Sequence, residues 1–360
     1  MGRNRSFLFY AKGVLAMKKQ YDYAVMIGRF QPFHLGHFHV ATEALKLAEH
    51  LIFIIGSHDK PRDTRNPFTT QERMEIILST GLPEDRIHFA PQVDHTYNDE
   101  RWIASIQASV YTIIFNKFRP DDVNIAIVGF DKDHSSYYLK KFPQWDLVEI
   151  EPKHLLDATS IRDALFSTHW MEYDEREFVN KDHFETVLGF SRDIWNQIFN
   201  EKEHLEIYKA SWNRAPYPPT FMTVDAVVTQ AGHILLVERG ALPGKGLWAL
   251  PGGFVGQDET LQAAVIRELY EETKLKVPKP VLVGSIADVH TYDDPHRSAR
   301  GRTISQAYHF KLTDTESGLP KIKGSDDAAK AFWVPFSKFA QSRNKMFEDH
   351  FNIVEHMVGI

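Results

Sequence analysis

Two histidines three residues apart give the chain its first candidate for chemistry. They are His34 and His37 in the segment GRFQPFHLGH, residues 28–37, which directly follows the apolar run 23–27. A glycine after a strand lets backbone approach a ligand closely, and the start of the next helix offers unpaired N–H groups at its positive end. Such a corner favours anions, with the imidazoles as donors and Arg29 as a fixed charge. The alternative is a pair of loop histidines with packing roles only.

A second candidate lies in the segment DATSIRDAL, residues 157–165. Thr159 and Ser160 stand where a helix would be capped, and Arg162 follows just inside its first turn. Hydroxyls, N–H groups and a guanidinium would therefore meet at one helix end, as a phosphate site requires. Taken alone, a Thr-Ser pair at a helix start is more often only a cap.

A third candidate is a cluster of glutamates between residues 252 and 275. On a helix, Glu268, Glu271 and Glu272 would fall within an arc of roughly 100° beside an apolar stripe. Arg267 can pair with Glu271 four residues on, but net negative charge remains. Mg²⁺ or Mn²⁺ prefers oxygen ligands and would offset that charge. The alternative is a solvated acidic helix face.

The elements that would position the histidines alternate between strands and helices. Strands are predicted at 23–27, 51–55, 86–89, 123–128 and 146–150, and helices at 37–49, 70–80, 100–117 and 134–141. This alternation indicates an α/β domain with a parallel sheet and helices on both faces. Ligands then bind beyond the carboxyl ends of the strands, where residues 28–37 fall.

A different pattern begins after about residue 170. Residues 170–209 appear helical, and three prolines within 213–220 mark a boundary. A hairpin turning at Ala231-Gly232 should follow, with a helix at 259–273, strands near 281–290 and 303–312, and a last helix near 345–357: an α+β domain. The predicted division is an N-terminal extension 1–20, a first domain 21–210, a linker 211–220 and a second domain 221–360.

Composition limits the class of protein. Of the 360 residues, 43% are hydrophobic and 25% charged, as is typical of folded domains, and cysteine is absent, which excludes disulfides and thiolate metal sites and fits a cytoplasmic protein. The net charge of −6 argues against a general nucleic-acid surface. The apolar run 51–56 is far shorter than the roughly 18 residues of a membrane span. We therefore expect neither nucleic acid nor membrane as a partner; a homo-oligomer remains open.

The first two candidates together resemble the nucleotidyltransferase superfamily, with its H-x-G-H and S-T-x-I-R signatures. The segments GRFQPFHLGH and IVGFDKDHSSYYLKKFPQW (127–145) narrow the resemblance to archaeal-like nicotinamide mononucleotide (NMN) adenylyltransferases, although Ala158 replaces one serine of the second signature. The resemblance implies a Rossmann-like fold in which the NMN phosphate attacks the α-phosphate of ATP, giving NAD and pyrophosphate, with magnesium on the ATP. An ionised phosphate nucleophile needs no general base.

That resemblance also implies residue roles. The charge on the phosphoryl group would be neutralised by His34, His37 and Arg162, and the substrate pocket shaped by Gly28, Arg29, Phe30, Thr159 and Ser160. Trp102 is the candidate for stacking on the pyridinium ring, with a buried core tryptophan as the alternative. Asp131 and Lys132 would line the same pocket. Nicotinic acid mononucleotide and pantetheine phosphate remain rival acceptors.

The glutamate segment resembles the Nudix box, with the single departure of Lys274 where glycine is usual. The resemblance implies metal-dependent hydrolysis of a nucleoside diphosphate linked to another group, with Glu268, Glu271 and Glu272 as ligands of Mg²⁺ or Mn²⁺. Glu259 and Arg267 would hold the loop and helix in place.

Substrate choice would lie outside the box. The segment 292–310 places Arg297, Arg300 and Arg302 in a turn-rich loop, where they would hold substrate phosphates or ribose, unless the loop is merely charged and solvated. In this order the two resemblances are those of the bifunctional NMN adenylyltransferase/Nudix hydrolase family. ADP-ribose, split to AMP and ribose 5-phosphate, is the expected second substrate. Another nucleoside diphosphate derivative, or a regulatory role as an ADP-ribose sensor, is the alternative.

Overall fold

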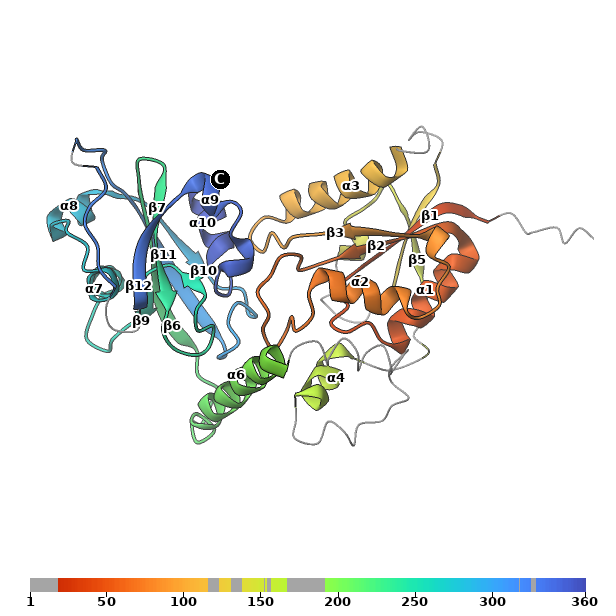
Figure 1. The fold of residues 1–360 in the computed structure, drawn as a ribbon, viewed down its shortest axis with the longest axis horizontal. Coiled ribbons are helices and arrows are strands. Elements are labelled where there is room, and N and C mark those ends of the chain that lie inside the picture. The colour runs from red at the N-terminus through yellow and green to blue at the C-terminus, as the bar shows by residue number, and fades with distance from the viewer. Residues whose placement is uncertain are drawn as a thin grey trace, which may run out of the picture.

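The computed structural model describes two domains that lie side by side (Figure 1). It describes residues 19–115, 123–130, 138–151, 153, 157–166, 192–316, 318–324 and 328–360. The long helix α6 (Arg192–Ala210) connects the domains and lies against both of them in the view of Figure 1. None of the described helices is long and apolar enough to cross a bilayer.

The first domain is built on a five-stranded sheet in which every pairing is parallel. Its order is β3-β2-β1-β4-β5, from β1 (Tyr21–Gly28), β2 (Ala48–Ile55), β3 (Ile87–Pro91), β4 (Ile125–Gly129) and β5 (Asp146–Glu149). The helices are α1 (Leu35–Leu47), α2 (Thr70–Leu78), α3 (Asp99–Phe115) and α4 (Ala158–Leu165), with a short 3-10 helix at Glu84–Arg86. The predicted parallel α/β architecture is confirmed.

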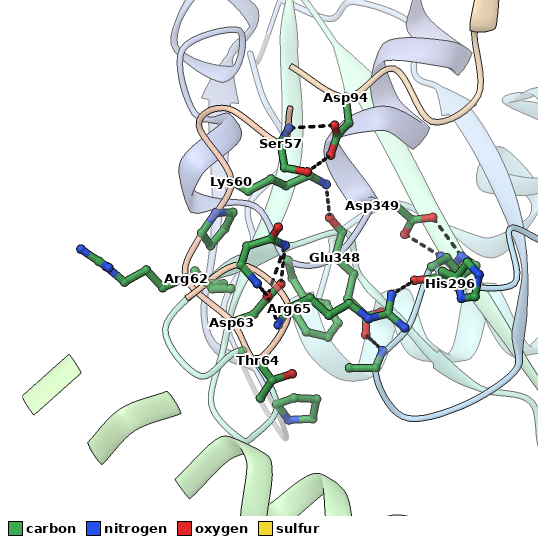
Figure 2. A pocket seen from close by; sticks show the side chains of 18 of the residues that line it. Ser57, Lys60, Arg62, Asp63, Thr64, Arg65, Asp94, His296, Glu348 and Asp349 are labelled. Atoms are coloured by element: carbon green, nitrogen blue, oxygen red, sulfur yellow. Dashed lines mark hydrogen bonds and ion pairs between the residues drawn. The ribbon is translucent and has the colours of Figure 1, made fainter. Parts of the chain in front are cut away.

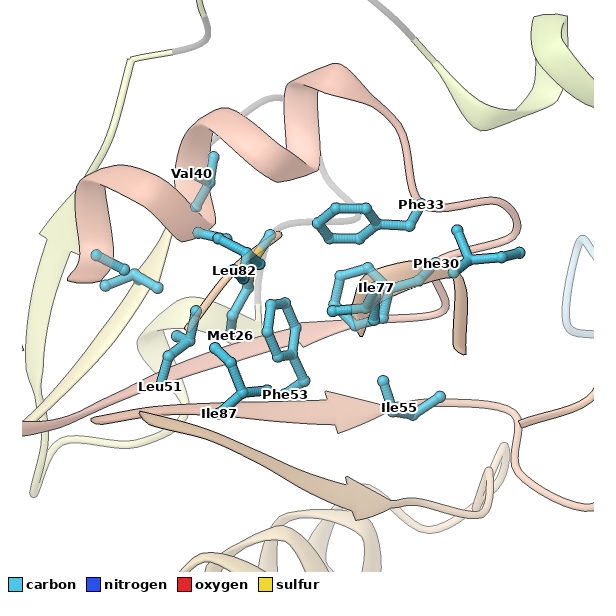
Figure 3. Packing of buried hydrophobic residues seen from close by; sticks show 14 of the residues in the cluster. Met26, Phe30, Phe33, Val40, Leu51, Phe53, Ile55, Ile77, Leu82 and Ile87 are labelled. Carbon is cyan, nitrogen blue, oxygen red and sulfur yellow. The ribbon is translucent and has the colours of Figure 1, made fainter. Parts of the chain in front are cut away.

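Both faces of this sheet are buried, which explains the unbroken apolar runs of its central strands. Ala24 and Met26 of β1 face the core beneath α1, α2 and α4, whereas Tyr23 and Val25 face the core beneath α3. Figure 3 shows the first of these cores, where Phe30 and Phe33 close the end nearest the β1–α1 loop. The loop that carries the histidines is therefore anchored to the core by its own aromatic residues.

The second domain has a mixed sheet of order β10-β11-β6-β7-β12, with β8 paired to β7 and β9 to β6. Its strands are β6 (Phe221–Gln230), β7 (His233–Arg239), β8 (Trp248–Ala249), β9 (Gly252–Phe254), β10 (Ile286–Tyr292), β11 (Thr303–Lys311) and β12 (Ala328–Pro335). Helix α7 (Leu261–Thr273) packs on one face, and α9 (Phe336–Phe339) and α10 (His350–Val358) on the other. The predicted hairpin is confirmed: Ala231 and Gly232 have φ of 46° and 70°, as its two-residue turn requires.

Three predicted elements differ from the structure. The strand expected near 281–290 begins only at Ile286, because Lys279–Gly284 forms helix α8, whose proline in the first turn favours a helix start. The last helix begins at His350 rather than 345, after a 3-10 turn at Arg343–Lys345. Of the helix predicted at 134–141, residues 134–137 lie outside the described part, and 138–140 form a single 3-10 turn.

The loop between β3 and α3 joins the first domain to the second. The backbone carbonyl of Asp94 accepts hydrogen bonds from Asn352 at 2.9 Å and from Arg343 at 3.1 Å. The hydroxyl of Tyr97 donates to the carboxylate of Asp349. These partly buried polar contacts fix how the two domains sit against each other.

Candidate functional sites

The β1–α1 corner orders both histidines through their backbone. Nδ1 of His34, the residue that caps α1, accepts the N–H of Gly36 at 3.1 Å, and Nδ1 of His37 accepts the N–H of His34 at 3.4 Å. The two rings stack with centroids 3.8 Å apart. Because each Nδ1 is an acceptor, the proton of each neutral ring lies on Nε2, so both rings can donate a hydrogen bond to an oxyanion.

His37 is held in its neutral form. Burial, and to a lesser extent the neighbouring His34, lower its pKa well below 6.5. Its ring packs against Phe30 at 5.1 Å and Phe33 at 5.6 Å between centroids. A neutral donor in an apolar surrounding keeps its position and its hydrogen across the physiological pH range.

Phe30 has a supporting place rather than the predicted place in the substrate pocket. Its side chain is 1% exposed, so it packs behind His37 instead of facing a ligand. Its backbone is left-handed, with φ of 51°. A Cβ at Gly28 would lie 2.8 Å from the Phe30 ring, so the glycine is required by this packing.

Helix α4 begins at Ala158, and its cap is Asp157 rather than Thr159 or Ser160. The Asp157 carboxylate accepts the N–H groups of Thr159 at 2.9 Å and Ser160 at 3.0 Å, as well as the Ser160 hydroxyl at 2.7 Å. Sequence reasoning missed this because both hydroxyl residues are themselves good caps. The backbone donors at this helix end are thus bonded to Asp157, and the anion-binding groups are chiefly side chains.

Arg162 brings the two predicted segments together. Its guanidinium donates to the carbonyl of Gln31 at 2.7 Å and to the hydroxyl of Thr159 at 3.1 Å. Burial, and then the nearby Arg29, lower the pKa of Arg162 to about 10, so it is still charged at neutral pH. This contact brings residues 28–37 and residues 157–165 together in the structure.

Arg73 of α2 supports the same corner and was not predicted. Its buried guanidinium donates to the carbonyls of Arg29 and Gly56, both at 2.6 Å, and so fixes the backbone from which Arg29 extends. Burial lowers the pKa of Arg73 to about 10. The only signal in the sequence was a charged residue on the inward face of an amphipathic helix, which does not reveal its partners.

The proposed acceptor pocket is only partly described. Trp102 of α3 is half-buried, with its ring 6.3 Å from that of Tyr138 and 6.1 Å from that of Phe142. Asp131 and Lys132 lie outside the described residues. Stacking of Trp102 on a pyridinium ring stays a prediction.

In the second domain, Arg267 is the centre of the glutamate cluster. Its guanidinium donates to Glu259 at 2.6 and 3.0 Å, and to Glu268 and Glu271 at 2.8 Å each. Glu259 in turn accepts the N–H of Gly256 at 2.7 Å, which ties the loop to the helix as predicted for Glu259 and Arg267. One guanidinium thus bridges two of the three proposed metal ligands.

Glu272 faces the other side of the cluster. It accepts the N–H of Gly252 at 3.1 Å, and burial, then the charge of Glu268, raise its pKa to about 8. Burial also raises the pKa of Glu268. A Cβ at Gly253 would lie 2.5 Å from a Glu268 oxygen, so the box glycine allows this close approach.

This donor set fits a hard divalent cation. Burial and neighbouring negative charge raise the pKa of these carboxyl groups, and a bound cation would lower it again by offsetting that charge. As they stand, no three His, Asp or Glu side chains in the described ranges are gathered closely enough to hold a metal. Glu272 is the one of the three candidates that Arg267 does not bond, whereas Glu268 and Glu271 are both paired with that guanidinium.

Two arginines of the loop between β10 and β11 have different surroundings. Arg297 is buried and forms two 2.9 Å hydrogen bonds with Asp349, so its guanidinium is committed within the protein rather than open to substrate as predicted. Arg302 is partly exposed and donates to the backbone carbonyl of Asp293. Arg302 is therefore more accessible to a ligand than Arg297.

Comparison with known proteins gives a match in each domain. Residues 25–133 match the Cytidylyltransferase-like family and residues 219–357 the NUDIX domain family. A crystal structure of a bifunctional NMN adenylyltransferase/ADP ribose pyrophosphatase from Francisella tularensis, complexed with AMP and a manganese ion, is 34% identical, with a TM-score of 0.87, over 94% of this chain and 99% of that chain.

Two further relatives each match one domain. Nicotinamide/nicotinic acid mononucleotide adenylyltransferase of Acinetobacter baylyi is 39% identical over 150 residues, 41% of this chain and 77% of that protein. ADP-ribose pyrophosphatase of Methanocaldococcus jannaschii is 37% identical over 132 residues, 36% of this chain and 72% of that protein.

Proposed function

This chain belongs to the family of bifunctional NMN adenylyltransferase/ADP-ribose pyrophosphatases, and we propose that one of its sites synthesises NAD while the other hydrolyses ADP-ribose. The first domain, about residues 21–210, transfers the adenylyl group of ATP to NMN and releases pyrophosphate. The second, 221–360 after a linker at 211–220, hydrolyses ADP-ribose to AMP and ribose 5-phosphate. The meeting of two distant segments at Arg162 is the observation that carries the first assignment.

In the transferase site, catalysis rests on placement and charge. The NMN phosphate is already ionised near neutral pH, so no side chain has to remove its proton. Nε2–H of His34 and His37, with the Arg162 guanidinium, are assigned to the oxygens that gain charge as the bond from the α-phosphorus to pyrophosphate breaks. The pocket for ATP is assigned to Gly28, Arg29, Thr159 and Ser160.

For the acceptor, Trp102 is assigned to the pyridinium ring, because a cationic ring favours an aromatic face. NMN carries an amide on that ring, whereas nicotinic acid mononucleotide carries a carboxylate. The negative charge of the carboxylate would cancel much of the cation–π attraction. We therefore rank NMN first.

In the Nudix site, Glu268, Glu271 and Glu272 are assigned to Mg²⁺ or Mn²⁺. When bound, the metal polarises the diphosphate and lowers the pKa of a bound water. Arg267 and Glu259 hold the loop and the helix in register, and the glycine backbone at 252 and 253 leaves room for the carboxylates. Arg302 is assigned to the phosphate or ribose of the substrate. The complete set of box carboxylates favours hydrolysis over a sensor role.

A product assay of the purified full chain tests both activities at once. With magnesium present, NMN plus ATP should give NAD in one tube, and ADP-ribose alone should give AMP in another, as separated by HPLC. NAD without AMP would leave the second domain as a sensor or as a hydrolase of another nucleotide. AMP without NAD would overturn the acceptor assignment around Trp102.

A further inference from the structure

Two adjoining cavities connect the transferase site to the second domain. The first, of about 220 Å³, lies between the domains (Figure 2). The second, of about 550 Å³, extends to Thr159 and Arg162. The residues that line both are Arg29, Thr64, Arg65, His296 and Ala299. The second cavity, which holds the transferase residues Arg29 and Arg162, thus has part of its wall from the Nudix domain.

The second cavity carries an excess of positive charge. Among the residues that the structure describes, its wall has five cationic and two acidic side chains: Arg29, Arg65, Arg162, Lys202, Lys209, Asp163 and Glu206. Lys202 alone is paired with both acids, at 3.3 Å from Asp163 and 3.6 Å from Glu206. The other four described cations form no ion pair with either of these carboxylates, so this part of the cavity is suited to a polyanion.

The Nudix loop in this wall, residues 294–299, is held firmly at its backbone. Arg65 of the transferase domain donates to the carbonyl of His296, as Figure 2 shows, and the N–H of His296 donates to Asp294 at 2.7 Å. The side chains of the next two residues are bonded to the two residues directly before α10: Arg297 to Asp349 at 2.9 Å and Ser298 to Glu348 at 2.7 Å. The imidazole of His296 is exposed and forms no hydrogen bond with any residue that the structure describes.

We infer that this Nudix loop forms one wall of the ATP polyphosphate pocket of the transferase, with His296 as a positioning residue for the phosphate tail. The inference rests on the proposed function of the first domain. ATP is favoured over NMN as the occupant because it carries three phosphates against one, and the pyridinium of NMN offsets part of its single phosphate charge. A donor on a rigid loop orients the tail without touching the reacting α-phosphorus.

The test is steady-state kinetics of His296→Ala in the full chain. We expect the KM for ATP to rise roughly 5- to 10-fold, which corresponds to one lost hydrogen bond. The KM for NMN, kcat for NAD synthesis and kcat/KM for ADP-ribose hydrolysis should stay within about twofold of wild type. The matched control is His290→Ala, an exposed histidine of the same domain that lines neither cavity and should change nothing.

Several outcomes would overturn the inference. Loss of hydrolysis with normal synthesis would place the loop in the Nudix site, and unchanged kinetics in both reactions would remove His296 from any site. A parallel fall of both activities with the KM for ATP unchanged would indicate damage to the fold. Arg65→Ala provides a second measurement, because it should also raise the KM for ATP. In the double variant the increase in KM should be smaller than the product of the two single increases, because both side chains act through one loop. A wild-type protein that makes no NAD would instead refute the proposed function itself.

Discussion

The backbone N–H of His34 is donated to Nδ1 of His37, so the residue that caps α1 also fixes the tautomer of its partner. This relationship leaves the proton of each neutral ring on Nε2. It also separates two functions of the same imidazole: the Nδ1 side holds the loop, and the Nε2 side acts on the phosphate.

Substitutions at His37 should separate these two functions. His37→Ala removes both the Nδ1 acceptor that holds the loop and the Nε2 donor to the phosphate. It should lower kcat for NAD synthesis by roughly 100-fold, the cost of one transition-state donor. His37→Asn keeps a polar group near the Nδ1 position and should restore thermal stability but not activity. Hydrolysis of ADP-ribose is the internal control and should be normal in both variants. Near-normal synthesis by His37→Ala would remove this residue from the transition state.

The lowered pKa of His37 predicts how stability depends on pH. Below pH 6.5 the unfolded chain binds a proton at this position while the folded chain does not, so its contribution to the free energy of unfolding is lost as pH falls below 6.5. Wild type should therefore lose more stability between pH 7.5 and 5.5 than His37→Gln, measured by urea unfolding. Equal losses in the two proteins would show that His37 is protonated in the folded state.

The fold of the first domain could be predicted from the sequence because its strands are apolar on both faces and its helices are amphipathic. The histidine corner could be predicted because a glycine, a strand end and two donors are adjacent in sequence. The contacts of Arg73, Asp157 and Arg297 were not, because each depends on which carbonyl or carboxylate the fold brings near, and residue type alone does not tell a buried arginine from one that binds a ligand. The acceptor pocket stays a prediction, since Asp131 and Lys132 lie outside the described residues.

Glu272→Gln should uncouple metal binding from stability. Its raised pKa means that ionisation in the folded, metal-free protein is unfavourable, so stability falls as pH rises from about 4.5 towards 8. The amide can still accept the Gly252 N–H but cannot ionise. In EDTA at pH 9 the variant should melt at a higher temperature than wild type, yet show no ADP-ribose hydrolysis and little stabilisation by Mn²⁺. Retained hydrolysis would exclude Glu272 as a ligand.

Lys274 ends α7 in the left-handed conformation, with φ of 48° and ψ of 34°, at the position where the Nudix box usually has glycine. A side chain there costs roughly 1 kcal/mol, which glycine avoids. Lys274→Gly should therefore raise the free energy of unfolding by up to about 1 kcal/mol in urea titrations, with hydrolysis unchanged. Lys276→Gly, two residues on and without a positive φ, is the control and should destabilise. A destabilised Lys274→Gly would mean that the lysine side chain stabilises this turn.

Asp349 connects the two domains through buried hydrogen bonds, accepting from Arg297 of its own domain and from Tyr97 of the other. Asp349→Asn leaves the Arg297 charge buried, with Asp225 at 3.8 Å as its remaining ion-pair partner among the described residues, and should cost about 3 kcal/mol. Tyr97→Phe removes one neutral donor and should cost about 1 kcal/mol. Asp293→Asn, at an exposed pair with Arg302, should cost less than about 1 kcal/mol. The Arg297 pairing also anchors the loop that carries His296, so Asp349→Asn should raise the KM for ATP whereas Asp293→Asn should not. If Asp349→Asn lost stability but kept the wild-type KM for ATP, the loop would keep its place without this ion pair.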